Sequence, residues 1–162
     1  MSDNEDKACL YKFNEEEEKV ESKAETGLNL VVAMDDLLNY LFVCVSAKDV
    51  PNVLRYSVCE EIIKLLAYSC SHLESSVRRF NYNRYMSQGD KKGLPRIFYK
   101  PYDILALSRK AEDEFDTAYG MIRRLRNRPS FKHRMSEFSR LSGIVKGLMR
   151  GWLIYLTNHG GK

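Results

Sequence analysis

The sequence predicts an all-α fold, an up-and-down antiparallel four-helix bundle with a flexible acidic N-terminal tail. Two observations support this prediction. Apolar residues recur at intervals of three and four along four stretches of the chain, the spacing of one helix face, and no stretch shows strand alternation of useful length. Proline residues and one long polar connection separate these stretches. We therefore expect four helices packed around one core.

Charge divides the chain into two parts. Residues 1–26 hold nine acidic residues and four lysines, a net charge of −5, whereas residues 27–162 hold 22 basic and 13 acidic residues, a net charge of +9. The acidic part has few large apolar side chains, so burial cannot offset the entropy lost on ordering. We expect residues 1–26 to be a disordered acidic tail and residues 27–162 to form the four-helix bundle.

The first helix is expected over residues 28–48 and ends before Pro51, which suits the first turn of a second helix over residues 52–85. The far end of the second helix, R-R-F-N-Y-N-R-Y, mixes arginines with aromatic rings. Such a mixture is typical of nucleic-acid surfaces, but it also describes a helix end whose tyrosines pack a loop. The candidate nucleic-acid contacts here are Arg78, Arg79 and Arg84.

A loop is expected over residues 87–102, followed by a third helix that begins at Asp103, interpreted as its N-cap, and ends near residue 126. Acidic residues lie near the start of this helix and arginines at its end, as the helix dipole favours. The basic residues outnumber what a helix end requires, and they continue past Pro129. The candidate nucleic-acid contacts here are Arg123, Arg124, Arg126, Arg128, Lys132 and Arg134.

The last helix is expected to begin at Ser136, interpreted as its N-cap, and to end near residue 156. Small residues recur every four positions along it and form a ridge of almost no side chain. Glycine inside a helix costs about 1 kcal/mol relative to alanine, so we infer that a neighbouring helix packs closely on this ridge. The helix-packing candidates are Ser139, Gly143, Gly147, Gly151 and Trp152.

The four cysteines show no C-x-x-C pair and no metal-like spacing with the three histidines. We expect buried thiols in a reducing compartment, no metal site and no cofactor. The N-terminus is acidic, unlike a signal peptide, and the last helix carries basic residues that do not suit a membrane span. A cytoplasmic location without membrane association is expected.

The order of these features resembles a group of small four-helix-bundle proteins. This group includes the accessory variability determinant of diversity-generating retroelements and the proteins encoded in ribosomal RNA intervening sequences. The resemblance spans residues 37–156. It rests on A-K-D-V-P-N after the first helix, on C-E-E-I-I-K-L-L in the second, on M-I-R-R-L-R at the end of the third, and on L-S-G-I-V-K-G-L-M-R-G-W-L in the last.

The resemblance implies a non-catalytic accessory protein that assembles as a homopentamer. It also implies binding to template RNA and to a partner reverse transcriptase, which supports mutagenic cDNA synthesis. By position, Arg123, Arg124 and Arg126 match the basic end of the third helix in the family. The identity of the RNA and the roles of the acidic tail and of the loop at 87–102 stay open.

Two other classes of function are compatible with the sequence. In a helical-bundle ribonuclease, His133 would act as general acid or base and Arg128 would stabilise the phosphorane charge, although Pro129 between them breaks the helix. In a protein-binding adaptor, the small-residue ridge would receive a partner helix.

Overall fold

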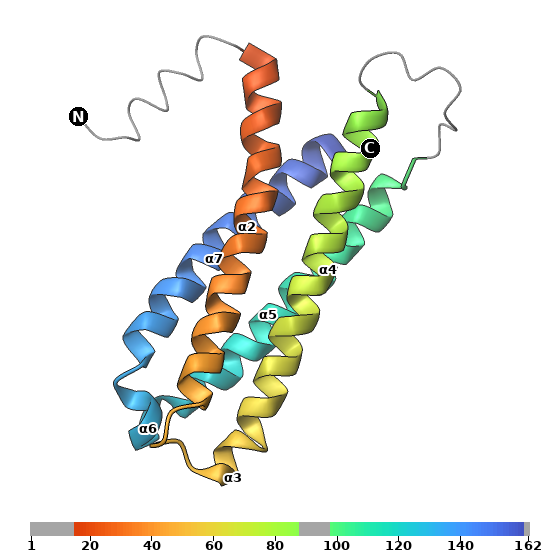
Figure 1. Ribbon diagram of the computed structural model, residues 1–162. Helices are drawn as coiled ribbons and strands as arrows, with labels where there is room; N and C mark the ends of the chain where they lie inside the picture. Colours follow the sequence, from red (N-terminus) through yellow and green to blue (C-terminus); the bar gives the residue numbers. More distant parts are fainter. Residues whose placement is uncertain (1–14, 88–97, 161–162) are drawn as a thin grey trace, which may run out of the picture.

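The chain is all-α, with four long helices that pack against one another (Figure 1). The computed structural model describes residues 15–87 and 98–160, with side chains at 27–87 and 98–158. The predicted all-α class is confirmed. The long helices are α2 (Glu15–Val45), α4 (Val58–Ser87), α5 (Pro101–Arg124) and α7 (Met135–Tyr155). Shorter elements connect or extend them: α3 (Asn52–Arg55), the 3₁₀ turn η1 (Leu125–Asn127), α6 (Pro129–Lys132) and the π-helical turn η2 (Leu156–Gly160).

Each long helix has two long neighbours: α2 and α5 both lie between α4 and α7. Along α4, Ser69 Oγ donates to the Ala111 carbonyl at 2.6 Å and Ser76 Oγ donates to the Ile104 carbonyl at 2.9 Å. Residue numbers rise along α4 while they fall along α5, so the two helices are antiparallel. Figure 1 shows the same alternation of direction from α2 through α7.

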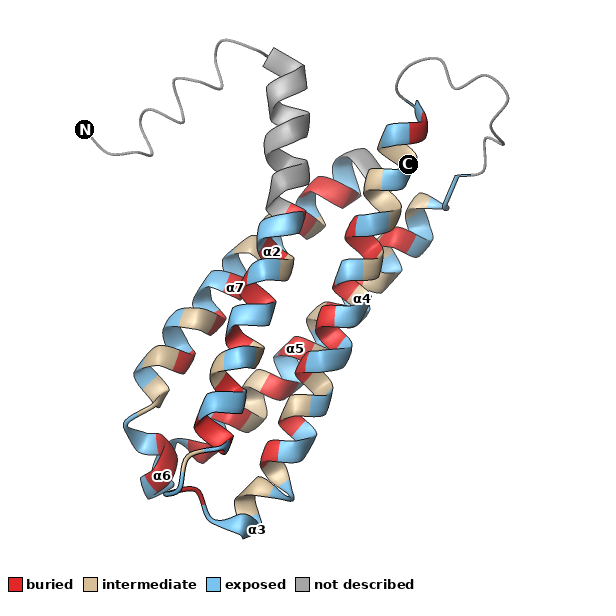
Figure 2. Ribbon diagram, viewed as in Figure 1, coloured by how far each residue is buried: buried red, intermediate tan, exposed pale blue. Residues whose placement is uncertain are grey.

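The indole of Trp152, on α7, lies at the centre of the contacts between helices. Its Nε1–H donates to Ser108 Oγ of α5 at 2.9 Å, and its ring meets Phe80 of α4 edge-on, with centroids 5.3 Å apart. Gly27 of α2 packs directly on the same ring. Trp152 is fully buried, as Figure 2 shows for the inward sides of all four helices, and it touches every other long helix.

Two predicted helix N-caps are wrong. α5 begins at Pro101 and α7 at Met135, so Asp103 and Ser136 lie inside the first turns and do not cap them. Proline is well suited to the first helical position because its φ is already helical, which moves the start of α5 ahead of Asp103. The predicted second helix is also interrupted, because the chain leaves helical geometry at Tyr56, between α3 and α4.

α2 begins at Glu15, within the segment predicted to be a flexible tail. Glutamate, lysine and alanine, which dominate residues 15–24, are good helix formers, and acids in a first turn suit the helix dipole. Residues 1–14 of the predicted tail, and residues 88–97 of the predicted loop, lie outside the described residues.

The part of the chain that the structure describes does not pack closely on the predicted α7 ridge. Ser139, Gly143 and Gly147 are exposed, and a Cβ added at either of these two glycines would meet no atom within 4 Å. Gly151 is half-buried. The glycine that does allow close approach is Gly27, where an added Cβ would lie 2.8 Å from Trp152 Cζ3. Among the described residues the ridge prediction is therefore wrong for Ser139, Gly143 and Gly147, because this side of α7 turns away from the core.

The stretch Gly27–Val45 of α2 is long and apolar enough to cross a membrane by length and composition alone. The core helix of a bundle meets the same criterion. Leu30, Leu37 and Leu41 of this stretch are fully buried in the core.

Replacing Gly27 by alanine should destabilise the protein, because the added methyl group overlaps a ring that Ser108 and Phe80 also hold in place. We expect the free energy of unfolding to fall by about 1–3 kcal/mol, the usual cost of overpacking. Gly120→Ala is the matched control: its Cβ would meet no atom within 4 Å, so helix propensity should raise stability by about 0.5–1 kcal/mol. Urea unfolding followed by circular dichroism measures both, and a gain in stability for both variants would contradict the close contact at Trp152.

Candidate nucleic-acid interface

The predicted nucleic-acid contacts fall into two groups at opposite ends of the bundle. Arg78, Arg79 and Arg84 lie on the last part of α4, beside the start of α5. The other group surrounds the connection from α5 to α7. α5 has 24 residues, and at about 1.5 Å per residue it separates the two groups by about 36 Å. The two groups therefore form separate candidate surfaces.

We call the second surface the arginine end and define it by Arg123, Arg124, Arg126, Arg128 and Lys132. All five side chains are exposed. Between them, Leu125 and Phe131 are buried and fix the short η1 and α6 turns to the core. Apolar anchors thus alternate with cations over ten residues, and the cations are left on the outside.

The arginine end keeps most of its positive charge. Among the described residues, none of its five cations forms an ion pair; the Arg123 guanidinium lies 5.9 Å from the centroid of the Tyr119 ring. The acidic Asp49, Glu60 and Glu61 lie near this end of the bundle, but the basic side chains outnumber them. The surface is therefore suited to a polyanion.

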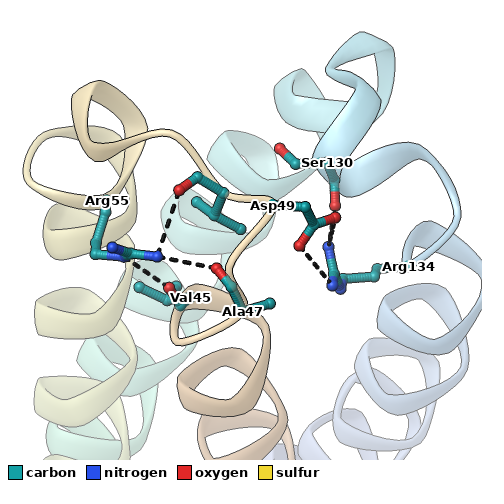
Figure 3. Close-up of polar contacts among 7 residues, drawn as sticks. Val45, Ala47, Asp49, Arg55, Ser130 and Arg134 are labelled. Atoms are coloured by element: carbon teal, nitrogen blue, oxygen red, sulfur yellow. Dashed lines mark hydrogen bonds and ion pairs between the residues drawn. The ribbon is translucent and has the colours of Figure 1, made fainter.

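Arg134, also predicted to contact nucleic acid, forms hydrogen bonds with other residues of the chain. Its guanidinium donates to both carboxylate oxygens of Asp49, at 3.0 and 3.1 Å, and to the Ser130 carbonyl (Figure 3). The hydrogen bond from Arg134 lowers the pKa of the Asp49 carboxyl. Because Asp49 lies in the loop after α2, this pair ties that loop to the turn before α7. A nucleic-acid contact by Arg134 would have to compete with it.

Arg55, which sequence reasoning missed, holds the other side of the same loop (Figure 3). It donates to the carbonyl oxygens of Val45 at 2.9 Å, of Ala47 at 2.9 Å and of Val50 at 3.3 Å. The last carbonyls of a helix have no partner within the helix, so Arg55 acts as a cap for α2. No sequence pattern identifies this role, since it depends on where α3 places the Arg55 side chain relative to the end of α2.

Of the three arginines on α4, Arg79 contacts the segment before α5, together with Tyr82 and Asn83. The Asn83 side chain donates to the Tyr99 carbonyl at 2.8 Å and accepts from the Tyr99 N–H at 2.9 Å. The Tyr82 ring meets the Tyr99 ring at 5.3 Å, and the Arg79 guanidinium lies 4.9 Å from the Tyr99 centroid. Tyrosines that pack a connecting segment were one of the two interpretations of this stretch. Arg78 is exposed and Arg84 half-exposed.

A histidine–carboxylate pair also joins α4 to α5. His72 Nδ1 lies 2.6 Å from Glu114 Oε1 on the partly exposed side of the two helices. No sequence pattern marks this pair, because 42 residues separate the two. Within the described ranges, no group of three histidine, cysteine or carboxylate side chains could hold a metal ion.

The described cysteines Cys44, Cys59 and Cys70 are buried free thiols, as predicted, and Cys9 lies outside the described residues. Cys70 Sγ donates to Asp35 Oδ1 at 3.0 Å. Burial, with this hydrogen bond as the next cause, raises the pKa of Cys70 to about 12. It is therefore an unreactive, structural thiol.

The two residues of the ribonuclease alternative lie at the two ends of α6. Arg128 precedes the helix and His133 follows it, and both are exposed. Because the four-residue α6 separates them, the two side chains do not project from one face of a long helix.

No protein-family model matches the chain, and no curated protein or solved structure matches it either. The most distinctive charged feature of the described structure is the arginine end.

The Asp49–Arg134 pair should make stability depend on pH in the acid range. Because the folded pKa of Asp49 is depressed, the contribution is complete above the unfolded value of about 3.9 and is lost as pH falls through the folded value. Asp49→Asn should therefore have a lower thermal midpoint than the parent at pH 7, and the gap should narrow as pH falls below about 3.9 and close below the folded pKa of Asp49.

The matched control is Asp113→Asn, which removes an exposed acid that forms no ion pair among the described residues. Its midpoint should track that of the parent at every pH. A gap for Asp49→Asn that stays constant down to pH 2 would show that the ion pair does not stabilise the loop.

Proposed function

We propose that this chain is a non-catalytic, cytoplasmic accessory protein of a diversity-generating retroelement, with the fold of an up-and-down antiparallel four-helix bundle. It binds template RNA and the partner reverse transcriptase and so supports mutagenic cDNA synthesis. The observation that carries the RNA-binding part is the arginine end, where five exposed cations lie within ten residues and form no ion pairs in the described chain. The retroelement and its transcriptase rest on the resemblance over residues 37–156.

Binding at the arginine end is electrostatic. Each phosphate that a lysine or arginine neutralises releases condensed counterions, so affinity falls steeply as salt rises. Five contacts to single-stranded RNA would give a slope of about −3.5 in log affinity against log salt. Phosphate contacts position a nucleic acid without reading its sequence, so little sequence preference is expected.

A protein-binding adaptor is the second candidate function. The observation that favours it is the exposed ridge of Gly143 and Gly147, on which none of the described residues packs. An adaptor would associate through apolar contact, and salt would then have little effect. Salt dependence therefore separates the two candidates.

The double variant Arg126→Gln/Arg128→Gln tests RNA binding. Loss of two phosphate contacts should weaken binding to a structured RNA by about tenfold at low salt and reduce the salt slope by about 1–2. Fluorescence anisotropy at 50 and 200 mM salt measures both quantities. The matched control is Arg109→Gln/Lys110→Gln, which removes the same charge from exposed positions on α5 outside the arginine end. Equal weakening by the two variants would show that RNA affinity depends only on the overall charge of the protein. No weakening by either variant would refute the proposal.

The absence of catalysis has its own test in His133→Ala. We expect the parent protein to leave a labelled RNA intact and the variant to bind it with unchanged affinity. Cleavage by the parent that disappears in His133→Ala and in Arg128→Ala would replace the accessory proposal with the ribonuclease alternative.

A further inference from the structure

The last turns of α4 and the segment before α5 bring two aromatic rings and a cation together at the surface. The Tyr82 and Tyr99 rings meet edge-on, with centroids 5.3 Å apart, and the Arg79 guanidinium lies over the Tyr99 ring, 4.9 Å from its centroid. Despite these contacts Tyr82 is 37% exposed and Tyr99 42% exposed. Tyr99 thus joins the other two side chains into one patch. We call this patch the tyrosine platform and define it by Arg79, Tyr82 and Tyr99.

Hydrogen bonds to the backbone hold the tyrosine platform in place. The Asn83 side-chain amide donates to the Tyr99 carbonyl at 2.8 Å, and its oxygen accepts from the Tyr99 N–H at 2.9 Å. This two-point contact fixes the segment to α4 without burying the Tyr99 ring. The rings are therefore in position before a ligand arrives, which reduces the entropy lost on binding.

Cations outnumber acids in the segments that carry the platform. Within the described residues 78–87 and 98–103, the basic residues are Arg78, Arg79, Arg84 and Lys100, and the acidic residue is Asp103. Arg78 and Lys100 are exposed, and none of the four basic residues forms an ion pair in the described chain. Positive charge beside exposed rings suits a ligand that is both anionic and aromatic.

We propose that the tyrosine platform binds the unpaired bases of a single RNA strand by stacking. A base can stack on a tyrosine ring or on an arginine guanidinium, while the neighbouring phosphates contact cations such as Arg78 and Lys100. The bases of a duplex are already stacked on one another and cannot use the platform in this way. The platform therefore differs in kind from the arginine end, where the proposed contacts are to phosphates.

The inference rests on the proposed function for the choice of RNA as the strand, but the site is a separate one. The length of α5 places the platform about 36 Å from the arginine end. An RNA that is partly paired and partly single-stranded can therefore occupy both surfaces, with its paired phosphates at the arginine end and its unpaired bases on the platform. Loss of either surface leaves the other intact.

The variant that tests stacking is Tyr82→Ala/Tyr99→Ala. It removes both rings and keeps both Asn83 hydrogen bonds, which use the backbone of Tyr99, so the segment before α5 should stay attached to α4. The dissociation constant for an unstructured RNA strand of about 12 nucleotides should rise by about tenfold or more. The same strand annealed to its complement should bind with unchanged affinity.

Two control variants accompany it. Tyr82→Phe/Tyr99→Phe keeps both rings and should bind the single strand as the parent does. Tyr68→Ala removes a ring that is 49% exposed on α4 outside the platform, and it should also leave the affinity unchanged. If the double alanine variant loses helix content by circular dichroism, Tyr82→Ala alone, on the surface of α4, replaces it, with an expected loss of about fivefold.

Fluorescence anisotropy at 50 and 200 mM salt supplies the measurement and separates this proposal from RNA binding at the arginine end. Loss of the rings should weaken single-strand binding by the same factor at both salt concentrations, whereas Arg126→Gln/Arg128→Gln should reduce the salt slope. Any of three results overturns the stacking proposal: single-strand affinity that the alanine variant leaves unchanged, an equal loss for strand and duplex, or an equal loss in Tyr68→Ala. None of the three affects the salt slope that tests the arginine end.

Discussion

The arrangement of the four helices depends on satisfying one buried indole. Trp152 donates to Ser108, Ser108 shares a hydrogen bond with Ser76 at 2.5 Å, and Ser76 donates to the Ile104 carbonyl. These bonds link α7, α5 and α4, and Gly27 fits α2 against the same ring. Sliding any helix by one turn would leave a buried donor unpaired, at a cost of about 1–3 kcal/mol, or would drive a side chain into the ring. The network therefore sets the register of the bundle.

The register of the helices determines which side chains lie at each end of the bundle. At the end opposite Trp152, the loop after α2 is held between Arg55 and Arg134, which use their guanidinium groups on carbonyl oxygens and on Asp49. The neighbouring cations of the arginine end have no such partners in the described chain, because buried Leu125 and Phe131 turn the backbone so that these cations face outward. Basic residues at one end of the molecule thus divide into structural ones, which hold a loop, and exposed ones, which are available to a ligand.

Much of the fold could be predicted from the sequence, since apolar spacing depends on each helix alone. The helices were found, and so was the exposure of Arg126 and Arg128, because these features are local. Arg134 and Arg126 look alike in the sequence, yet only Arg134 meets a carboxylate, 85 residues away. Spacing along α7 identified a ridge of small residues but not the side it faces. The residue that admits Trp152 is instead an isolated glycine, Gly27, which no repeat marks.

The glycines of the described helices differ in what compensates for their cost. Gly27 costs helix stability and gains packing on Trp152 inside the chain, whereas Gly143 and Gly147 bear the same cost with open space around them. The same residue type therefore accompanies close packing on α2 and open backbone on α7, and spacing along the sequence does not distinguish the two, because the direction in which each glycine faces is set by the packing of the whole bundle.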